Sequence, residues 1–322
     1  MPPPDPLVPA LQAKAHALAH PTPEGRCTCE KATLADRPDA TVVRHGTLVA
    51  KAHTGDTDPT ELSARLAAAA HPTLGTVLLP PLHPFATTLH DRQVTLWPPG
   101  TPVDPDTPEA APWEAAATLL ARLHRVPPAE LPHPLPDMRG PEKSARALAR
   151  LRAAGPHPAA APVERAWGTL PPWARAETRG PARDTVCHGD FHLGQLVRAP
   201  GEPDRESAWR LIDVDDLGLG NPAWDLARPA AWYACGLLAP EEWTRFLTAY
   251  QQAGGPAVPP PGTDPWPALD VPARALTIQT AALAIAKAVT EGRLLDEVEQ
   301  AVIDTCDRMA TLPPEFATEQ AK

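Results

Sequence analysis

The sequence predicts an α+β protein with two lobes: a small β-rich N-terminal lobe with one helix, and a larger, mainly helical C-terminal lobe. Residues 26–98 concentrate β-branched residues and turn signals, whereas residues 99–322 carry apolar residues at helical spacing. The break at Trp97-Pro98-Pro99-Gly100 separates these patterns, and we place the lobe boundary there. A chain of 322 residues is too long for one small core, and residues 1–25 are expected to form a leader with a short helix.

The leader and the N-terminal lobe follow from spacing and turn chemistry. A His45-Gly46 turn between two β-branched runs predicts a hairpin. Asp58 followed by Pro59 and Glu61 is a helix-start signature that precedes an Ala-rich stretch. The expected elements are helices over 7–20 and 58–70, a strand over 27–34, the hairpin over 41–53, and strands over 76–79 and 93–97.

Helices dominate the rest of the chain. Trp113, Ala117 and Leu120 stand at helical spacing, and Pro-rich turns separate the later helical candidates. Two short apolar runs, 185–187 and 211–212, are predicted strands. The expected helices span residues 109–126, 140–154, 163–173, 224–238, 240–253, 268–291 and 294–312. This order of elements is that of a kinase-like two-lobed fold.

Composition excludes several classes of partner and location. The net charge of −10 argues against nucleic acid, because phosphate backbones select basic surfaces. No apolar run approaches the length of a membrane span and no signal-peptide pattern is present, so we expect a cytoplasmic protein. The five Cys are scattered and odd in number, which disfavours a disulfide framework. Cys27 and Cys29 lack a second Cys pair at ligand spacing and alternate like a strand, which disfavours a metal site there.

Two motifs 23 residues apart carry the chemistry. Each of the runs His188-Gly189-Asp190 and Ile212-Asp213 places an Asp just past a short apolar strand. Asp190 can orient an attacking hydroxyl. Asp213 and the amide oxygen of Gln195 are hard oxygen donors of the kind that hold Mg²⁺ against the phosphates of a nucleotide.

Lys51 lies in the predicted strand Val49-Ala50-Lys51-Ala52 beside an apolar neighbour on its own face. A strand Lys in a kinase-like lobe holds the α- and β-phosphates and pairs with a Glu on the next helix, for which Glu61 is the first candidate. The alternative is a strand Lys that faces solvent.

Other polar residues are predicted to support the site. His188 is expected to brace the loop of Asp190, whereas His192 either reaches the site or lies on the surface. Asp215 and Asp216 either assist the metal, meet a cationic substrate or form a solvated acidic turn. Asp225, in the first turn of a helix, is expected to tie that helix to the catalytic loop.

Taken together and in order, these motifs resemble the aminoglycoside phosphotransferase family of kinase-like enzymes. The resemblance runs from about Ala40 to Ala253 and includes His-Gly-Asp with an amide five residues past the Asp, Ile-Asp, and the stretch Gly220-Asn-Pro-Ala-Trp-Asp225-Leu-Ala. It implies that Asp190 is catalytic, that Gln195 and Asp213 hold Mg²⁺, and that Lys51, paired with Glu61, holds phosphate. The backbone at Leu96, Trp97 and Pro98 would take the adenine of ATP.

The sequence departs from the family pattern at three places. Gln195 stands where the family usually has Asn, a form that is similar to maltokinase-type and glucosamine-kinase-type relatives. The segment expected to cover the phosphates, residues 34–39, contains no Gly, and Val214 stands where the family often has an aromatic residue.

The sequence therefore predicts a small-molecule kinase that transfers the γ-phosphate of ATP, with Mg²⁺, to a hydroxyl of a sugar, amino sugar or aminoglycoside-like acceptor. The alternative is a catalytically weak pseudokinase that binds nucleotide as a regulator. A protein kinase is disfavoured because no Asp-Phe-Gly or Ala-Pro-Glu segment is present. Acceptor contacts are expected from helices between about residues 140 and 175 and after residue 225.

Overall fold

The chain divides into two units. The computed structural model describes residues 7–21, 27–37, 40–132, 134–180, 184–202, 205 and 208–312. Unit 1 comprises Met1–Ala111, Pro128–Pro136 and Gly194–Asp215, and unit 2 comprises Pro112–Pro127, Asp137–Leu193 and Asp216–Lys322. Residues 194–215, which the sequence analysis assigned to the C-terminal lobe, thus belong to unit 1.

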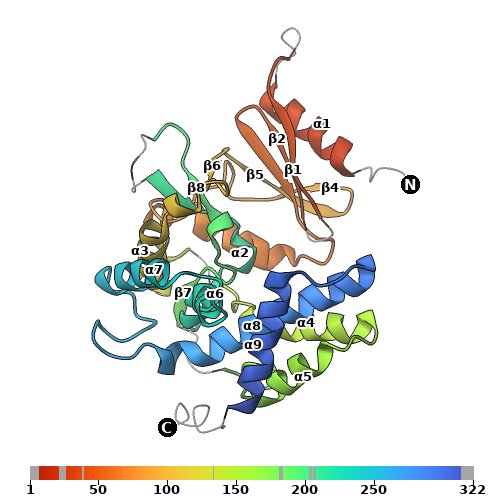
Figure 1. The fold of residues 1–322 in the computed structure, drawn as a ribbon. Helices are drawn as coiled ribbons and strands as arrows, with labels where there is room; N and C mark the ends of the chain where they lie inside the picture. Colours follow the sequence, from red (N-terminus) through yellow and green to blue (C-terminus); the bar gives the residue numbers. More distant parts are fainter. Residues whose placement is uncertain are drawn as a thin grey trace. The chain divides into compact units, whose positions relative to one another are not determined.

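An antiparallel five-stranded sheet with the order β1-β2-β3-β5-β4 forms the centre of unit 1 (Figure 1). The predicted hairpin is present, because Gly46 has a φ of +57° and turns the chain between β2 and β3. The strands are β1 (Lys31–Arg37), β2 (Ala40–His45), β3 (Leu48–Ala52), β4 (Thr87–Leu89) and β5 (Arg92–Trp97).

Helix α1 (Leu7–Ala19) lies against this sheet (Figure 1). Leu7, Leu11 and Ala15, spaced four residues apart, form one buried stripe. That stripe packs with Val43, Ala50 and other core residues of the sheet. The leader helix is therefore an integral layer of unit 1.

Unit 1 also contains α2 (Pro59–Ala69) and a small three-stranded sheet with the order β6-β8-β9. Asp58 caps α2 by accepting hydrogen bonds from the backbone N–H groups of Thr60 and Glu61, as the helix-start signature predicted. The strands of the small sheet are β6 (Thr101–Pro102), β8 (Leu196–Arg198) and β9 (Trp209–Leu211). Strand β8 begins directly after Gln195 and β9 ends two residues before Asp213, so the pairing of these two strands positions both residues.

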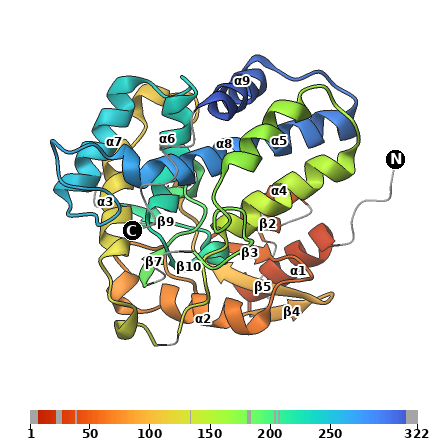
Figure 2. The ribbon, with the colours of Figure 1, turned by 90° about the horizontal axis from the view of Figure 1, so that it is seen from below.

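Unit 2 is mainly helical. Its longest helix, α8 (Trp266–Glu291), is apolar around most of its circumference. This helix contacts α4, α5, α6 and α9, and Figure 2 shows the first three beside it. The helices are α3 (Trp113–His124), α4 (Gly140–Ala154), α5 (Ala160–Thr169), α6 (Ala223–Ala234), α7 (Pro240–Gln252), α8 (Trp266–Glu291) and α9 (Glu297–Thr311). Two short antiparallel strands, β7 (Thr185–Cys187) and β10 (Gly218–Gly220), complete the unit.

The structure confirms the predicted α+β class, with a small β-sheet N-terminal region and a larger helical C-terminal part. Several local predictions were wrong. Residues 76–79 form no strand, and only Leu78 makes an isolated bridge, to Leu211. The first strand begins at Lys31 rather than at residue 27, and α9 begins after its capping residue Asp296 rather than at residue 294.

Among the described residues, no helix is long and apolar enough to cross a membrane.

Candidate functional site

Asp190 stands on the loop that follows β7 in unit 2. Gly189 has a φ of +83°, and a Cβ atom there would lie 2.3 Å from the carbonyl oxygen of Asp216, so only Gly fits the turn. Two cations form ion pairs with the Asp190 carboxylate. Lys143 Nζ lies 2.8 Å from Oδ2, and Arg228 donates a hydrogen bond of 2.9 Å to Oδ1.

The two cations fix the charge of Asp190. Partial burial would raise the pKa of its carboxyl, but the ammonium of Lys143 and the guanidinium of Arg228 hold that pKa well below its usual range. Asp190 is therefore an anion at any physiological pH. Such a carboxylate is a weak base and a firm hydrogen-bond acceptor, which suits the task of orienting a hydroxyl.

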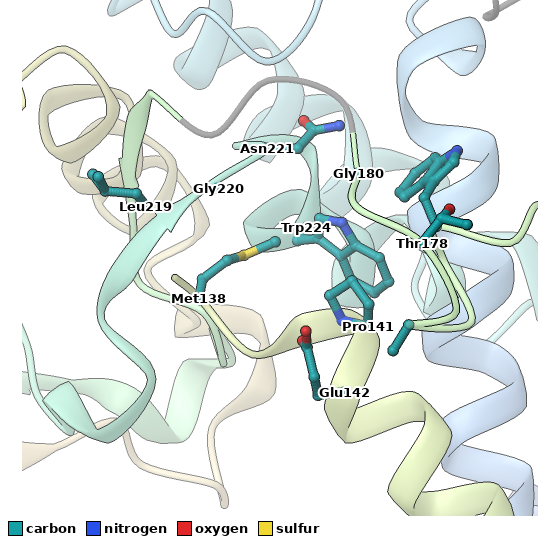
Figure 3. Close-up of a pocket in the computed structure, with 11 residues that line it drawn as sticks. Met138, Pro141, Glu142, Thr178, Gly180, Leu219, Gly220, Asn221 and Trp224 are labelled. Carbon is teal, nitrogen blue, oxygen red and sulfur yellow. The ribbon is translucent and has the colours of Figure 1, made fainter. Parts of the chain in front are cut away.

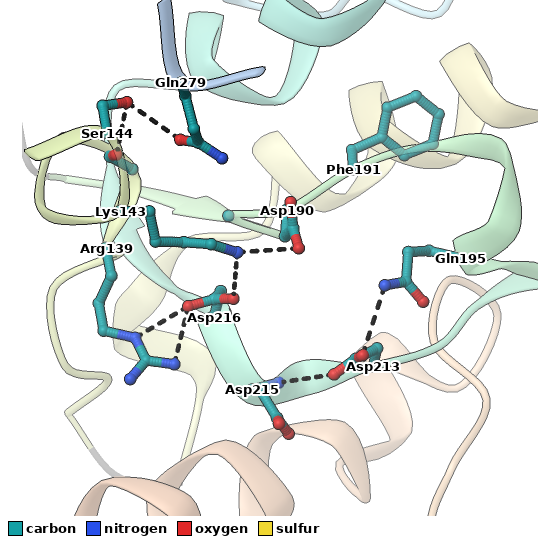
Figure 4. A network of polar contacts seen from close by, with 12 residues as sticks. Arg139, Lys143, Ser144, Asp190, Phe191, Gln195, Asp213, Asp215, Asp216 and Gln279 are labelled. Atoms are coloured by element: carbon teal, nitrogen blue, oxygen red, sulfur yellow. Dashed lines mark hydrogen bonds and ion pairs between the residues drawn. The ribbon is translucent and has the colours of Figure 1, made fainter. Parts of the chain in front are cut away.

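Asp216 extends this network, as Figure 4 shows. Lys143 bridges the two carboxylates, because its Nζ also lies 2.8 Å from Asp216 Oδ2. Arg139 approaches Oδ1 of Asp216 at 2.8 Å. Asp216 is thus buried and paired within unit 2, and it is not part of a solvated acidic turn.

Asp225, in the first turn of α6, anchors the loop of Asp190 from below. Its side chain is 1% exposed and accepts hydrogen bonds from the backbone N–H groups of His188 (2.6 Å) and Gly189 (2.8 Å). His124 Nε2 lies 2.9 Å from Oδ2, and the other ring nitrogen of His124 lies 2.8 Å from the hydroxyl of Tyr250. His188 itself is fully buried and contributes its backbone to this anchor.

In unit 1, Lys51 lies among carboxylates. Its Nζ is 2.7 Å from Asp213 Oδ1 and 2.9 Å from Asp215 Oδ2. Burial would lower the pKa of Lys51, but these two carboxylates raise it above its usual value, so the side chain stays protonated. His53, just past the end of β3, contacts Asp215 at 3.2 Å.

The expected pairing of Lys51 with Glu61 does not match these contacts. Glu61 lies in the first turn of α2 and pairs at 3.0 Å with Arg65, one turn further along the same face. Asp213 and Asp215 neutralise Lys51 instead.

Asp213 and Gln195 lie together in unit 1. Gln195 Nε2 is 3.4 Å from Asp213 Oδ2 (Figure 4). Asp213 has a φ of +65°, in the left-handed region that a non-Gly residue occupies at a cost and that recurs at functional sites.

The residues of this set fit a magnesium ion. The carboxylates of Asp213 and Asp215 are hard oxygen donors, and a half-turn of the Gln195 amide would exchange Nε2 for Oε1 at the same place. Gln195 and the two Asp side chains would therefore hold the ion.

Two segments were expected to contact the nucleotide: residues 96–98 at the adenine and residues 34–39 over the phosphates. The carbonyl of Leu96 accepts a hydrogen bond from the N–H of Leu82, and Pro98 has no N–H to offer. Trp97 is buried, and its indole donates to Thr95. Of the Gly-free segment, residues 34–37 lie in β1, whereas residues 38 and 39 fall outside the described residues.

Sequence reasoning missed most of the cations around Asp190. Lys143 and Arg139 lie about 50 residues before it, and Arg228 lies one turn after Asp225 in α6. The rarity of Lys in this chain was the available signal for Lys143. His192 is half-buried. Its charge also lowers the pKa of Asp190, but by less than the charges of Lys143 and Arg228 do.

A small, open pocket lies beside α4 in unit 2 (Figure 3). Trp173 and Trp224 contribute indole rings that meet edge to face at 6.4 Å, and Asn221 contributes an amide. Among the described residues, the buried Oε2 atom of Glu142 has no hydrogen-bond partner. Trp224 also lines a smaller hollow with Lys143, Asp190 and Arg228.

Comparison with known proteins identifies the class. The model of a phosphotransferase enzyme family matches residues 42–270, which is most of the chain, and the chain belongs to this family. No curated protein matches the sequence significantly.

Solved structures of kinase-like proteins share the fold. A thermostable mutant of the aminoglycoside phosphotransferase APH(4)-Ia is 14% identical with a TM-score of 0.58, over 87% of this chain and 94% of that chain. A choline/ethanolamine kinase family protein from Mesorhizobium loti is 16% identical with a TM-score of 0.56, over 95% and 96%. Spectinomycin phosphotransferase APH(9)-Ia, in complex with ADP and spectinomycin, is 14% identical with a TM-score of 0.53, over 91% and 93%.

Proposed function

We propose that this protein is a small-molecule kinase that transfers the γ-phosphate of ATP to a hydroxyl of an amino sugar or aminoglycoside-like acceptor. The observation that carries the proposal is the ionised Asp190, held by Lys143 and Arg228 on a loop that Asp225 anchors. Family membership supports phosphoryl transfer, and the similar structure in complex with ADP and spectinomycin supports a nucleotide and an amino-bearing acceptor as the substrates.

Each residue set has a distinct task in this mechanism. Lys51 would contact the phosphates of the nucleotide, and Gln195, Asp213 and Asp215 would hold Mg²⁺, which would neutralise the charge that develops on the phosphates. Asp190 accepts a hydrogen bond from the acceptor hydroxyl and aligns its oxygen for in-line attack. Lys143 and Arg228 keep Asp190 ionised and fix its orientation. The alternative of a regulator without turnover has no such use for these cations.

The pocket beside α4 supports an amino-bearing acceptor. A buried carboxylate oxygen without a partner is costly, and an ammonium group would satisfy Glu142 with a charge-assisted hydrogen bond. The indoles of Trp173 and Trp224 give the pocket an apolar lining of the kind that suits a sugar ring.

An acceptor panel tests this function. Aminoglycosides, amino sugars and their neutral deaminated analogues would each be offered with ATP and Mg²⁺, and the phosphate ester and ADP would be measured. We expect turnover of amino-bearing acceptors and a lower kcat/KM for their neutral analogues. Glu142→Gln should remove this preference, with about a tenfold higher KM for amino acceptors and little change for neutral ones.

The matched control is Glu130→Gln, an exposed carboxylate outside the pocket, which should retain the preference. Nucleotide binding without ester formation on any acceptor would favour the regulator. Turnover of neutral acceptors alone would contradict the assignment of Glu142.

A further inference from the structure

Three imidazoles and a thiol meet on unit 1, and the mechanism above uses none of them. His16 and His20 stand one turn apart at the end of α1, His45 ends β2, and Cys27 lies in the segment that precedes β1. Helix α1 packs against β2 (Figure 1), which brings the three segments together. One nitrogen or sulfur atom from each residue lies within 4.8 Å of all the others.

The spacing of these atoms matches a tetrahedral metal site. His16 Nδ1 and His20 Nε2 lie 3.3 and 3.1 Å from His45 Nε2, and Cys27 Sγ lies 3.2 Å from His20 Nε2 and 3.4 Å from His45 Nε2. Zinc–nitrogen bonds of about 2.0–2.1 Å and a zinc–sulfur bond of about 2.3 Å place tetrahedral ligands about 3.3–3.6 Å apart. Four of the six pairs of ligand atoms lie within a few tenths of an ångström of these separations, and all six pairs lie within 4.8 Å.

Hydrogen bonding alone leaves the cluster poorly satisfied. His45 is 2% exposed, and its Nε2 atom faces two ring nitrogens and one sulfur at contact distance. A neutral imidazole nitrogen carries at most one proton, so it can serve only one of these neighbours as a donor. A divalent cation at the centre would be bound by all four groups at once.

Cys29 borders the cluster through two of its atoms. The backbone N–H of Cys29 donates a hydrogen bond to Cys27 Sγ at 3.4 Å. Cys29 Sγ itself lies 3.5 Å from His20 Nε2, so a second thiol borders the site.

We propose that His16, His20, Cys27 and His45 bind one zinc-type divalent ion. Four protein ligands close the coordination sphere, which is typical of structural rather than catalytic zinc. The ion would fasten the end of α1 to β2 and to the segment before β1, and so stabilise the layer that covers the sheet of unit 1. This function is independent of phosphoryl transfer.

The pattern that reveals the site is the His pair four residues apart, not the Cys pair. Cys27 and Cys29 were expected to lie in a strand, but β1 begins only at Lys31, and both precede it. The remaining ligands lie on α1 and β2, which no local spacing rule connects to the Cys residues.

Cobalt binding tests the proposal. The full chain, without an affinity tag and with its thiols kept reduced, would be stripped of metal and titrated with Co²⁺ alone. We expect one equivalent to bind, with the strong visible absorption of tetrahedral Co²⁺ and a near-ultraviolet thiolate-to-metal charge-transfer band. Added Zn²⁺ should displace Co²⁺ and so abolish both the visible absorption and the charge-transfer band. The charge-transfer band separates this site from the oxygen donors of Asp213 and Asp215, which cannot produce it.

Variants locate the ligands. His45→Ala should weaken Zn²⁺ binding more than about 100-fold, because losing a ligand exceeds the effect of losing an outer hydrogen bond. His16→Ala, at a less buried position, gives the same test should His45→Ala fold poorly. The double variant Cys27→Ser/Cys29→Ser should lose the charge-transfer band.

Cys235→Ser and His83→Ala remove a thiol and an imidazole elsewhere and should keep the wild-type spectrum. Zn²⁺ should also raise the melting temperature of the wild type but not that of the double Cys variant. The absence of a charge-transfer band in the wild type, or its survival in the double Cys variant, would overturn the proposal.

Discussion

The neighbours of Asp190 keep its carboxylate ionised. Lys143 and Arg228 each contribute a cation within 3 Å of its carboxylate, and Lys143 is shared with Asp216. Lys143 and Arg228 would therefore act as positioning residues, through the ionisation and orientation of Asp190.

Lys143→Ala should move the acid limb of the pH profile. Removal of the ammonium removes an interaction that lowers the pKa of Asp190, so that pKa rises and the ionised, active form is lost at a higher pH. We expect the acid limb of kcat/KM to shift upward. Arg150→Ala, an exposed cation on the same helix, should leave the profile unchanged. An unshifted limb in Lys143→Ala would contradict the role of Lys143.

Single residues also show how far local patterns reach. Asp190, Asp213 and Lys51 were predicted as site residues because each sits at a strand end or in a strand with a recognisable neighbour pattern. The partner of Lys51 was predicted as Glu61, whereas Asp213 and Asp215 occupy that place. Long-range charge pairing depends on tertiary packing, and local spacing does not encode it.

Asp225 connects helix α6 to the loop after β7 by hydrogen bonds. Its carboxylate bonds two consecutive backbone N–H groups and His124, so a helix start, a loop and α3 share one buried anion. Burial would raise the pKa of Asp225, but the hydrogen bond from His124 and the charges nearby lower it below its usual value.

Asp225→Asn should destabilise the fold. The amide can retain only some of these hydrogen bonds and leaves its partners buried, so we expect a loss of about 3 kcal/mol in the free energy of unfolding, measured by chemical denaturation. Asp304→Asn, at an exposed position of α9, should change it by less than about 0.5 kcal/mol. Comparable losses in both variants would contradict the anchor.

The hydrogen bonds of Asp225 also predict how the stability of the fold changes with pH. The folded pKa of Asp225 is lower than its unfolded value of about 3.9, so its stabilisation is complete above that value. The stabilisation is lost as the pH falls through the lower folded pKa.

Elements were predicted from sequence to different degrees. The long helices of unit 2 agree closely with their apolar periodicity, and α4 has the predicted bounds Gly140–Ala154. The short strands β4, β6, β8 and β10 were missed, because two or three residues carry no periodic signal. Their pairing is set by partners far along the chain, such as β6 with β8.

The two units hold different parts of the proposed chemistry. Lys51, Gln195 and Asp213 belong to unit 1, whereas Asp190, Lys143 and Arg228 belong to unit 2. The sequence indicated both sets, but it assigned Gln195 and Asp213 to the C-terminal lobe, because the chain leaves unit 2 and returns within 22 residues.

This division predicts separable defects. Asp213→Asn should weaken Mg²⁺-nucleotide binding at least about tenfold, because it removes a carboxylate from the proposed metal site and from Lys51. Asp190→Asn, a matched Asp-to-Asn change, should leave that binding intact. Calorimetric titration with a non-hydrolysable ATP analogue measures both. Equal weakening in the two variants would contradict separate tasks.

The central claim is tested most directly by following the γ-phosphate itself. With γ-labelled ATP, Mg²⁺ and an amino-sugar acceptor, the wild type should move the label into a phosphate ester, and Asp190→Asn should lower that rate by about 1,000-fold. A label that stays on the nucleotide in the wild type with every acceptor, or an unchanged rate in Asp190→Asn, would contradict the account.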